Sequence, residues 1–365
     1  MTHSVLALED GSVFFGVSFG APLDAEAEVV FNTSMTGYQE IATDPSYRGQ
    51  MVCMTYPLIG NYGVWSGDAE ARRPWISGLI VRELATCYSN WRAEGDLDSW
   101  LRREGVPGIQ GIDTRALTRR LRVRGALRGV MVRGAGQSEV EALVERAGRV
   151  SALGEQDLVG GTAAERGYQL SAGERAPRIV VMDCGIKQNI LRSLGRRGAD
   201  LLVVPYSATS GEIAALEPDG IVISNGPGDP AALPAVARTV AELMAGEVPI
   251  LGICLGHQLI GLAAGGTTSR LPFGHHGGNH PVRSLDDGKV HITSQNHEFQ
   301  VDADSLPRSS GLMISRVNLN DGSVEGLRHI SKPILSVQYH PEGAPGPQDS
   351  QYIFDEFLSR VGKPR

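Results

Sequence analysis

The chain has 365 residues, 41% of them hydrophobic and 21% charged, which is ordinary for a globular protein and long enough for two domains. With 34 Lys and Arg against 41 Asp and Glu, the formal net charge is −7, which does not favour a nucleic-acid binder. The cysteines are scattered without CxxC spacing, which argues against a disulfide framework and a zinc site and favours a reducing compartment (Cys53, Cys87, Cys184 and Cys254). The sequence does not begin like a signal peptide and contains no apolar run of about 18 residues, so we expect a cytoplasmic protein without a membrane span.

The first half of the chain is predicted to be rich in β-strands. Two strand-like runs flank an Asp10-Gly11 turn within residues 4–20, which indicates a hairpin. Further strands are expected at residues 26–34 and 76–84, and helices at residues 98–104, 113–122 and 138–148.

The helix over residues 138–148 carries a local start signal. Ser138 is expected to be its N-cap, with Glu141 three residues later completing a capping box. Residues 1–150 are therefore assigned to a first domain. Residues 151–177 are rich in Gly, Ala and Glu with little periodicity, and we assign them to a linker.

The second half, residues 178–365, alternates strands and helices. This alternation predicts an α/β fold with a mostly parallel sheet and helices on both faces. Ligands of such sheets bind beyond the carboxyl ends of the strands, where the turns at residues 224–230 and 252–258 fall. The strands are expected at residues 178–185, 200–206, 220–230 and 248–253, and the helices at residues 187–198, 235–246 and 254–266.

The segment Gly252-Ile253-Cys254-Leu255-Gly256 places a cysteine between a predicted buried strand and a helix. A strained turn of this kind lifts a nucleophile clear of the sheet, and the two glycines allow close backbone packing. The helix N-terminus favours a thiolate, and the N–H of Leu255 is placed to stabilise an oxyanion. The alternative is a buried core cysteine, because a free cysteine packs like a small hydrophobic residue.

A candidate base follows another predicted strand. His340 ends the run SVQYH, and Glu342 lies two residues on, where it could orient the imidazole through its second nitrogen. A lone histidine before a proline can also be purely structural. The combination of the Cys254 turn, His340, Glu342 and the α/β pattern favours a Cys-His-Glu triad.

Longer segments resemble one family. GICLGHQ and the later HPE resemble the class I glutamine amidotransferases, whose nucleophile, base and orienting acid correspond to Cys254, His340 and Glu342. The loop at residues 224–230 is similar to the oxyanion loop of these enzymes. Most of the chain, from about Val5 to about Phe357, is similar to the carbamoyl-phosphate synthetase small-subunit family, through residues 31–50, 55–63, 111–122, 273–282, 294–299 and 340–349.

The resemblance implies a β-rich α/β domain at residues 1–150, particular to that family, and a mostly parallel α/β class I amidotransferase domain at residues 178–365. It also implies a set of residues that hold L-glutamine: Ser46, Gly226, Gly228, Leu255, Gln258, Asn296, Glu298 and Phe299. The chain departs from the family at Glu298, where relatives usually have Gly, and at Pro272, where relatives often have Lys.

The resemblance further implies that Cys254 attacks the glutamine amide and that the ammonia passes to a large subunit. That partner would use ATP, with Mg, and bicarbonate to make carbamoyl phosphate for arginine or pyrimidine biosynthesis. No GxxxxGK[ST] loop is present here, which agrees with ATP chemistry on the partner, so we expect no cofactor in this chain. We expect no metal in it either. A heterodimer or a larger oligomer of heterodimers is expected, with neither nucleic acid nor membrane as a partner.

The same sequence features leave other functions open. The runners-up are an amidotransferase that serves another synthetase, a free-standing glutaminase, and a catalytically silent regulatory subunit. The histidines of GHHGGNH have no thiolate or carboxylate nearby in sequence, which argues against a metal site (His275, His276 and His280). The basic stretch Arg115 to Arg133 is interpreted as a solvated or subunit-contacting surface, and Cys184 as a core residue.

Overall fold

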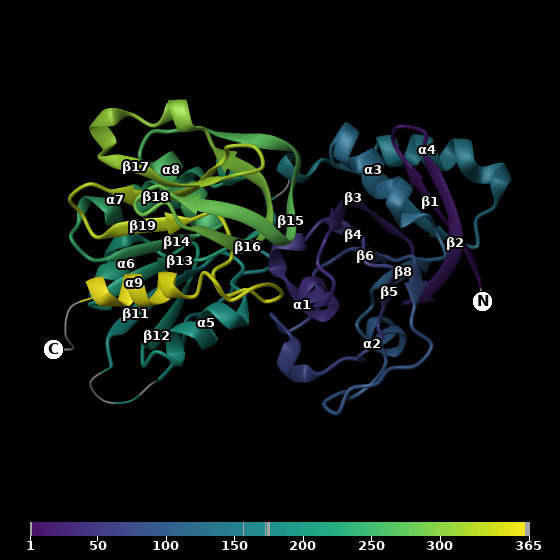
Figure 1. Ribbon diagram of the computed structural model, residues 1–365, viewed down its shortest axis with the longest axis horizontal. Coiled ribbons are helices and arrows are strands. Elements are labelled where there is room, and N and C mark those ends of the chain that lie inside the picture. Colours follow the sequence, from purple (N-terminus) through teal and green to yellow (C-terminus); the bar gives the residue numbers. More distant parts are fainter. Residues whose placement is uncertain (1, 156, 172, 174–175, 362–365) are drawn as a thin grey trace. The chain divides into compact units, whose positions relative to one another are not determined.

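The computed structural model describes residues 2–155, 157–171, 173 and 176–361 (Figure 1). They divide into two compact units. The first comprises Met1–Gln156 and Pro272–His276, and the second Asp157–Leu271 and Gly277–Arg365. A short segment from the second half of the chain, Pro272–His276, thus belongs to the first unit.

The first unit is built around a closed barrel with the strand order β1-β2-β8-β6-β4-β3-β9 (Figure 1). Its strands are β1 (His3–Leu8), β2 (Val13–Gly20), β3 (Ala25–Asn32), β4 (Gln50–Met54), β6 (Gly78–Ile80), β8 (Pro107–Gln110) and β9 (Leu127–Arg133). A separate two-stranded sheet is formed by β5 (Leu58–Ile59) and β7 (Glu83–Leu84). The helices are α1 (Tyr38–Thr43), α2 (Leu97–Arg103), α3 (Thr114–Arg124) and α4 (Val140–Gly148).

Both faces of the central barrel strands are buried. In β3, Val29 and Phe31 pack in one hydrophobic cluster while Val30, between them, packs in another. Strand β4 repeats this pattern, with Met51 in the first cluster and Val52 in the second. Successive side chains of a strand point to opposite faces, so a strand covered on both sides reads as a continuous apolar run.

Most of the elements predicted for the first half are present, with two corrections. The hairpin is formed by β1 and β2, paired antiparallel across the predicted turn. The single strand expected at residues 76–84 is instead two strands in different sheets, β6 and β7. Ser138 is not an N-cap: it lies inside a short 3-10 turn, Gln137–Glu139, that precedes α4. There the Glu139 carboxylate accepts from the backbone N–H of Gly136 at 2.9 Å, so the chain turns earlier than predicted.

The second unit contains a sheet with the order β10-β12-β11-β13-β14-β19-β18-β17-β15-β16. The pairings from β12 to β19 in this order are parallel, which confirms the predicted mostly parallel sheet. Antiparallel strands extend it on both sides. The strands are β10 (Tyr168–Leu170), β11 (Arg178–Asp183), β12 (Asp200–Pro205), β13 (Gly220–Ile223), β14 (Ile250–Ile253), β15 (Thr268–Ser284), β16 (Val290–Val301), β17 (Leu312–Asn318), β18 (Val324–His329) and β19 (Ile334–Val337).

Helices cover both faces of this sheet, as predicted. Two hydrophobic clusters share the strands between them: Val181 of β11 packs with α5 and α9, while its neighbour Val180 packs with α6, α7 and α8. This alternation explains the unbroken apolar runs of the parallel strands. The helices are α5 (Gln188–Gly195), α6 (Ser210–Ala215), α7 (Pro234–Ala245), α8 (Leu255–Ala263) and α9 (Tyr352–Arg360).

The segment assigned to a linker, residues 151–177, contains regular structure where it is described. A 3-10 turn forms at Leu153–Glu155, and β10 pairs antiparallel with β12 at the edge of the sheet. Residues 156, 172 and 174–175 lie outside the described part of the chain. Among the described residues, no helix is both long and apolar enough to cross a membrane.

Candidate active site

Cys254 lies at the turn between β14 and α8. Its backbone angles, φ 53° and ψ −104°, are uncommon for a residue with a side chain, so the turn is strained. A Cβ on Gly256 would lie 2.1 Å from the carbonyl oxygen of Ile223, and a Cβ on Gly252 would lie 2.7 Å from that of Gly256. Only glycine fits at these two positions, which accounts for the Gly-x-Cys-x-Gly spacing.

The start of α8 is tied to the neighbouring strands by backbone hydrogen bonds. The Cys254 N–H donates to the carbonyl of Val337 at 2.9 Å, and the Gly256 N–H donates to that of Ser224 at 3.1 Å. Leu255 is the first residue of the helix. N–H groups of a first helical turn lack intrahelical acceptors and lie at the positive end of the helix dipole. Cys254 therefore sits at a position that favours negative charge.

His340 follows β19 and is oriented by Glu342. Its Nδ1 lies 2.7 Å from the Glu342 Oε1, and its backbone N–H donates to the Ser294 carbonyl at 2.8 Å. Both side chains are buried. Because a carboxylate oxygen accepts, Nδ1 carries the hydrogen, and Nε2 is the nitrogen that remains for proton transfer.

A buried lysine that the sequence analysis did not identify completes this group. The Nζ of Lys187 lies 2.8 Å from the same Glu342 Oε1, and the lysine side chain is only 2% exposed. Its backbone N–H donates to the Asn225 Oδ1 at 3.1 Å. Lysine is almost never fully buried unless it is paired, so nothing in the local sequence indicated burial. The available signal was position, because Lys187 follows β11 at the same sheet edge as Cys254.

Attraction between these charges outweighs the cost of burying them. Burial lowers the pKa of His340, but the Glu342 carboxylate raises it to about 10, with a smaller contribution from the Cys254 side chain and opposition from Lys187. Burial raises the pKa of Glu342, but Lys187 and His340 lower it to about 2. At neutral pH, His340 is therefore protonated and Glu342 ionised.

Strand β16 brings further predicted residues to Cys254. The Cys254 thiol donates to the Asn296 carbonyl, with 3.6 Å between sulfur and oxygen. The side-chain amide of Gln258 donates to the Phe299 carbonyl at 2.8 Å, and its backbone N–H donates to the Cys254 carbonyl at 3.1 Å. These four residues of the predicted set thus form one connected group in the second unit.

Other predicted residues lie on the loop after β13 and in the first unit. A Cβ on Gly226 would lie 2.1 Å from the Cys184 carbonyl oxygen, and Gly228 has a φ of 90°, so both positions require glycine. Ser46 lies in a 3-10 turn of the first unit, Pro45–Tyr47, where its N–H donates to the Asp44 Oδ1 at 2.9 Å.

Glu298, which departs from the family pattern, uses its side chain for an ion pair. Its Oε2 lies 3.4 Å from the Nη2 of Arg270, and its side chain is 4% exposed. The carboxylate is thus engaged by a neighbouring strand, which leaves the backbone of residue 298 as the part that resembles the family.

The remaining cysteines differ from Cys254. Cys184 is fully buried in a hydrophobic cluster, and burial raises the pKa of its thiol. Burial likewise raises the pKa of Cys53 to about 12, whereas Cys87 is exposed. Cys254 combines the strained turn with an adjacent histidine.

Two arginines of the basic stretch have acidic partners within the first unit. Arg120 pairs with Asp10 at 2.5 Å, and Arg128 pairs with Glu9. Internal pairing of this kind reduces the charge available to a polyanion.

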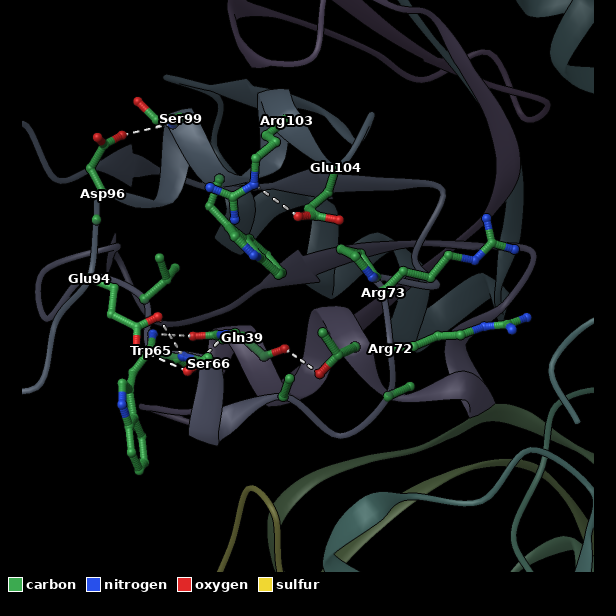
Figure 2. A pocket seen from close by; sticks show the side chains of 17 residues that line it. Gln39, Trp65, Ser66, Arg72, Arg73, Glu94, Asp96, Ser99, Arg103 and Glu104 are labelled. Atoms are coloured by element: carbon green, nitrogen blue, oxygen red, sulfur yellow. Dashed lines mark hydrogen bonds and ion pairs between the residues drawn. The ribbon is translucent and has the colours of Figure 1, made fainter. Parts of the chain in front are cut away.

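The first unit contains a cavity of about 410 Å³ (Figure 2). Several of its polar groups form hydrogen bonds with one another. The Gln39 side-chain amide donates to the Trp65 carbonyl and accepts from the Trp65 N–H, and the Glu94 carboxylate accepts from the N–H and the hydroxyl of Ser66. Cations and anions both line it, including the Arg103–Glu104 pair. The site residues described above are not among those that line it. We assign no ligand to this cavity.

Comparison with known proteins gives matches over both units. The family model described as the carbamoyl-phosphate synthase small chain, CPSase domain, matches residues 6–131, and the model of class I glutamine amidotransferases matches residues 180–360. The chain is 51% identical over 359 residues to the carbamoyl phosphate synthase small chain of Methanopyrus kandleri, with 98% of each chain covered. The chain belongs to the carbamoyl-phosphate synthase small-chain family.

Further members of the carbamoyl-phosphate synthase small-chain family are similarly close. The chain is 50% identical to the small chain of Symbiobacterium thermophilum, with 98% of each chain covered. It is also 50% identical to that of Bacillus caldolyticus, with 98% of this chain and 96% of the relative covered. The Cys254 turn lies within the class I glutamine amidotransferase match, as do His340 and Glu342.

Proposed function

We propose that this chain is the glutamine-hydrolysing subunit of a carbamoyl-phosphate synthase and that Cys254, His340 and Glu342 are its catalytic triad. The observation that carries the proposal is the pairing of a strained cysteine turn with a buried histidine whose Nδ1 is held by Glu342 at 2.7 Å. A cysteine, a base and a group that orients the base are the parts needed for nucleophilic attack on an amide.

In the first half of the reaction the Cys254 sulfur bonds to the side-chain carbonyl carbon of glutamine. The resulting oxyanion accepts hydrogen bonds from the backbone N–H groups of Leu255 and Gly228. Protonated His340 gives its proton to the departing nitrogen, the C–N bond breaks, and ammonia leaves. A γ-glutamyl thioester on Cys254 remains.

In the second half a water molecule hydrolyses the thioester. His340, now neutral, accepts a proton from the water as its oxygen bonds to the carbonyl carbon. The C–S bond then breaks, the sulfur leaves as thiolate, and glutamate is released. Because Lys187 and Glu342 balance each other, protonated His340 carries the remaining positive charge of the buried group, which suits an anionic sulfur as the leaving group.

The substrate contacts follow from the residues around Cys254. The connected group of Gln258, Asn296 and Phe299 offers amide and carbonyl groups, which suit a neutral amide with a zwitterionic end. Further proposed contacts come from the backbone or side chains of Ser46, Gly226, Gly228, Leu255 and Glu298.

The ammonia is proposed to pass to a large subunit that makes carbamoyl phosphate from bicarbonate with ATP and Mg. This chain itself would then need neither a cofactor nor a metal. We further propose a cytoplasmic heterodimer, or a larger oligomer of heterodimers, whose product enters arginine or pyrimidine biosynthesis.

Glutamate release by the purified chain tests the proposal. It is measured with and without the large subunit of the same organism, with Cys254→Ser as the control. Weak hydrolysis that rises with the partner and disappears in the variant is expected. Hydrolysis that the partner leaves unchanged would instead favour a free-standing glutaminase, and hydrolysis that survives Cys254→Ser would overturn the assigned nucleophile.

A further inference from the structure

We propose that Glu325 is a positioning residue for the glutamine site and acts through a buried relay, Gln295 and His297, on the Phe299 carbonyl and the Gln258 amide. The inference rests on the proposed function, because that function places Gln258 and Phe299 at the substrate. It adds a carboxylate to which the mechanism above gives no role.

Glu325 is a fully buried carboxylate held by two amides. It lies on β18, and its side-chain oxygens accept from the Gln295 Nε2 at 2.9 Å and from the Asn318 Nδ2 at 2.8 Å. An ionised carboxylate is costly to bury unless hydrogen bonds and a compensating charge accompany it. The two amides supply hydrogen bonds but no charge, so the compensating charge has to come from another member of the network.

The relay runs from Glu325 to the substrate-binding group in two steps. Gln295 and His297 are two residues apart on β16, so their side chains share one face of the strand. The Gln295 Oε1 lies 3.0 Å from the His297 Nε2, and the His297 Nδ1 lies 2.7 Å from the Phe299 carbonyl oxygen. Every member of this chain of contacts is buried.

Donor and acceptor roles fix the direction of the relay. A carboxylate only accepts, so the NH₂ group of Gln295 faces Glu325 and its oxygen faces His297. The His297 Nε2 must then donate. The Phe299 carbonyl also only accepts, so Nδ1 donates as well. Both nitrogens of His297 therefore face acceptors, an arrangement that suits a ring protonated on both nitrogens with the Glu325 carboxylate as its counter-charge.

The far end of the relay sets the orientation of Gln258. The Phe299 carbonyl accepts from both His297 and the Gln258 Nε2, at 2.7 and 2.8 Å. The same Gln258 Nε2 also lies 3.2 Å from the Gln338 Oε1, so both of its hydrogens are directed inward. The Gln258 Oε1 is left to meet the substrate, and as an acceptor it suits the N–H groups of glutamine.

Removing the charge of Glu325 should therefore disturb substrate binding without touching the triad. With Glu325→Gln the second proton of His297 loses its counter-charge, and a neutral ring can no longer donate at both ends. In the complex with the large subunit we expect KM for glutamine to rise about tenfold or more with kcat within about twofold. Glu325→Leu, which also removes the acceptor, should give at least the same increase.

Two controls separate positioning from general loss of structure. Glu28→Gln changes another buried carboxylate, in the first unit, which accepts from the Leu153 N–H at 3.0 Å, and it should leave KM unchanged. Carbamoyl phosphate synthesis from added ammonia bypasses the glutamine site, so complexes that contain either Glu325 variant should retain it. Co-purification of each variant with the large subunit shows that the variant folds and assembles.

A double variant tests whether Glu325 acts through the relay. If it does, adding Gln295→Leu to Glu325→Leu should raise KM no further than the larger single effect, whereas independent roles would multiply. If the wild-type protein hydrolyses glutamine but KM is unchanged in both Glu325 variants, or the effects multiply in the double variant, the inference is overturned and the proposed function still stands. Wild-type activity indistinguishable from that of Cys254→Ser would instead refute the proposed function, and the inference with it.

Discussion

Lys187 and Glu342 form a fully buried ion pair, with 2.8 Å between Nζ and Oε1, and His340 bonds the same carboxylate oxygen at 2.7 Å. Glu342 therefore lies between two cations. Without Lys187, Glu342 would be a buried carboxylate with only His340 as a partner, and burial would favour its neutral form. The lysine keeps Glu342 ionised and so helps it to orient the imidazole.

Replacing this lysine should cost both stability and activity. Lys187→Met leaves a buried carboxylate short of one cation, and we expect the free energy of unfolding to fall by about 3–5 kcal/mol. Glutaminase kcat should fall by about tenfold or more, since His340 loses its fixed orientation. Lys332→Met is the matched control: this lysine caps the carbonyls of Met244 and Ala245 at the end of α7, and its loss should cost about 1 kcal/mol or less. Equal losses in both variants would contradict the account.

The contribution of His340 to stability should decline with rising pH. Its pKa is about 10 in the folded protein against about 6.5 when unfolded, so between these values the folded state binds more protons. The contribution is fully present below about pH 6.5 and is lost as the pH rises through about 10. Urea unfolding of wild type and His340→Asn should show a difference that shrinks between about pH 6 and pH 9.5. A difference that grows over this range would be inconsistent with a protonated His340.

Gly256 should be intolerant of even a methyl group. A Cβ there would meet the Ile223 carbonyl oxygen at 2.1 Å, so Gly256→Ala must push α8 away from β13. We expect a loss of at least about 2 kcal/mol in unfolding free energy and of most glutaminase activity. Gly211→Ala provides the control, because that helical glycine has open space around it and should gain up to about 1 kcal/mol. Chemical denaturation of the two variants gives the comparison.

Glu298 should contribute little through its side chain to glutamine binding. Its carboxylate is paired with Arg270 at 3.4 Å, so Glu298→Ala removes that pair and keeps the backbone of β16. We expect KM for glutamine to change by less than about threefold, which corresponds to less than about 0.7 kcal/mol. Steady-state kinetics would decide the point, and a tenfold increase would show that the carboxylate itself supports the substrate.

Local patterns predicted the elements that hold Cys254. The alternation of strands and helices and the Gly252 and Gly256 spacing are properties of short segments, and short segments determine a strand-turn-helix unit. The antiparallel extension of the sheet beyond β19 was not predicted. Which side chains of β15 and β16 are buried depends on neighbours that are distant in the sequence. The alternation of buried and exposed residues along these strands could therefore not be predicted from the local sequence.

Lys187 and Glu325 were missed for a related reason. Charged residues are expected at the surface, and burial of either one depends on partners that are distant in the chain: Glu342 for the lysine, and Gln295 with Asn318 for the glutamate. The predicted N-cap at Ser138 was wrong for the opposite reason, because the local sequence signal was present but the structure did not use it. The chain turns earlier, where the Glu139 carboxylate accepts from the backbone N–H of Gly136. Sequence patterns thus predicted the elements, and the buried polar contacts required the fold.

The covalent intermediate tests the central claim most directly. The complex is mixed with glutamine, quenched in acid during turnover, digested, and analysed by mass spectrometry for a γ-glutamyl thioester. The account predicts that the adduct lies on the peptide that contains Cys254 and that Cys254→Ser lacks it. An adduct on Cys53, Cys87 or Cys184, or sustained glutamine hydrolysis by Cys254→Ser, would contradict the account.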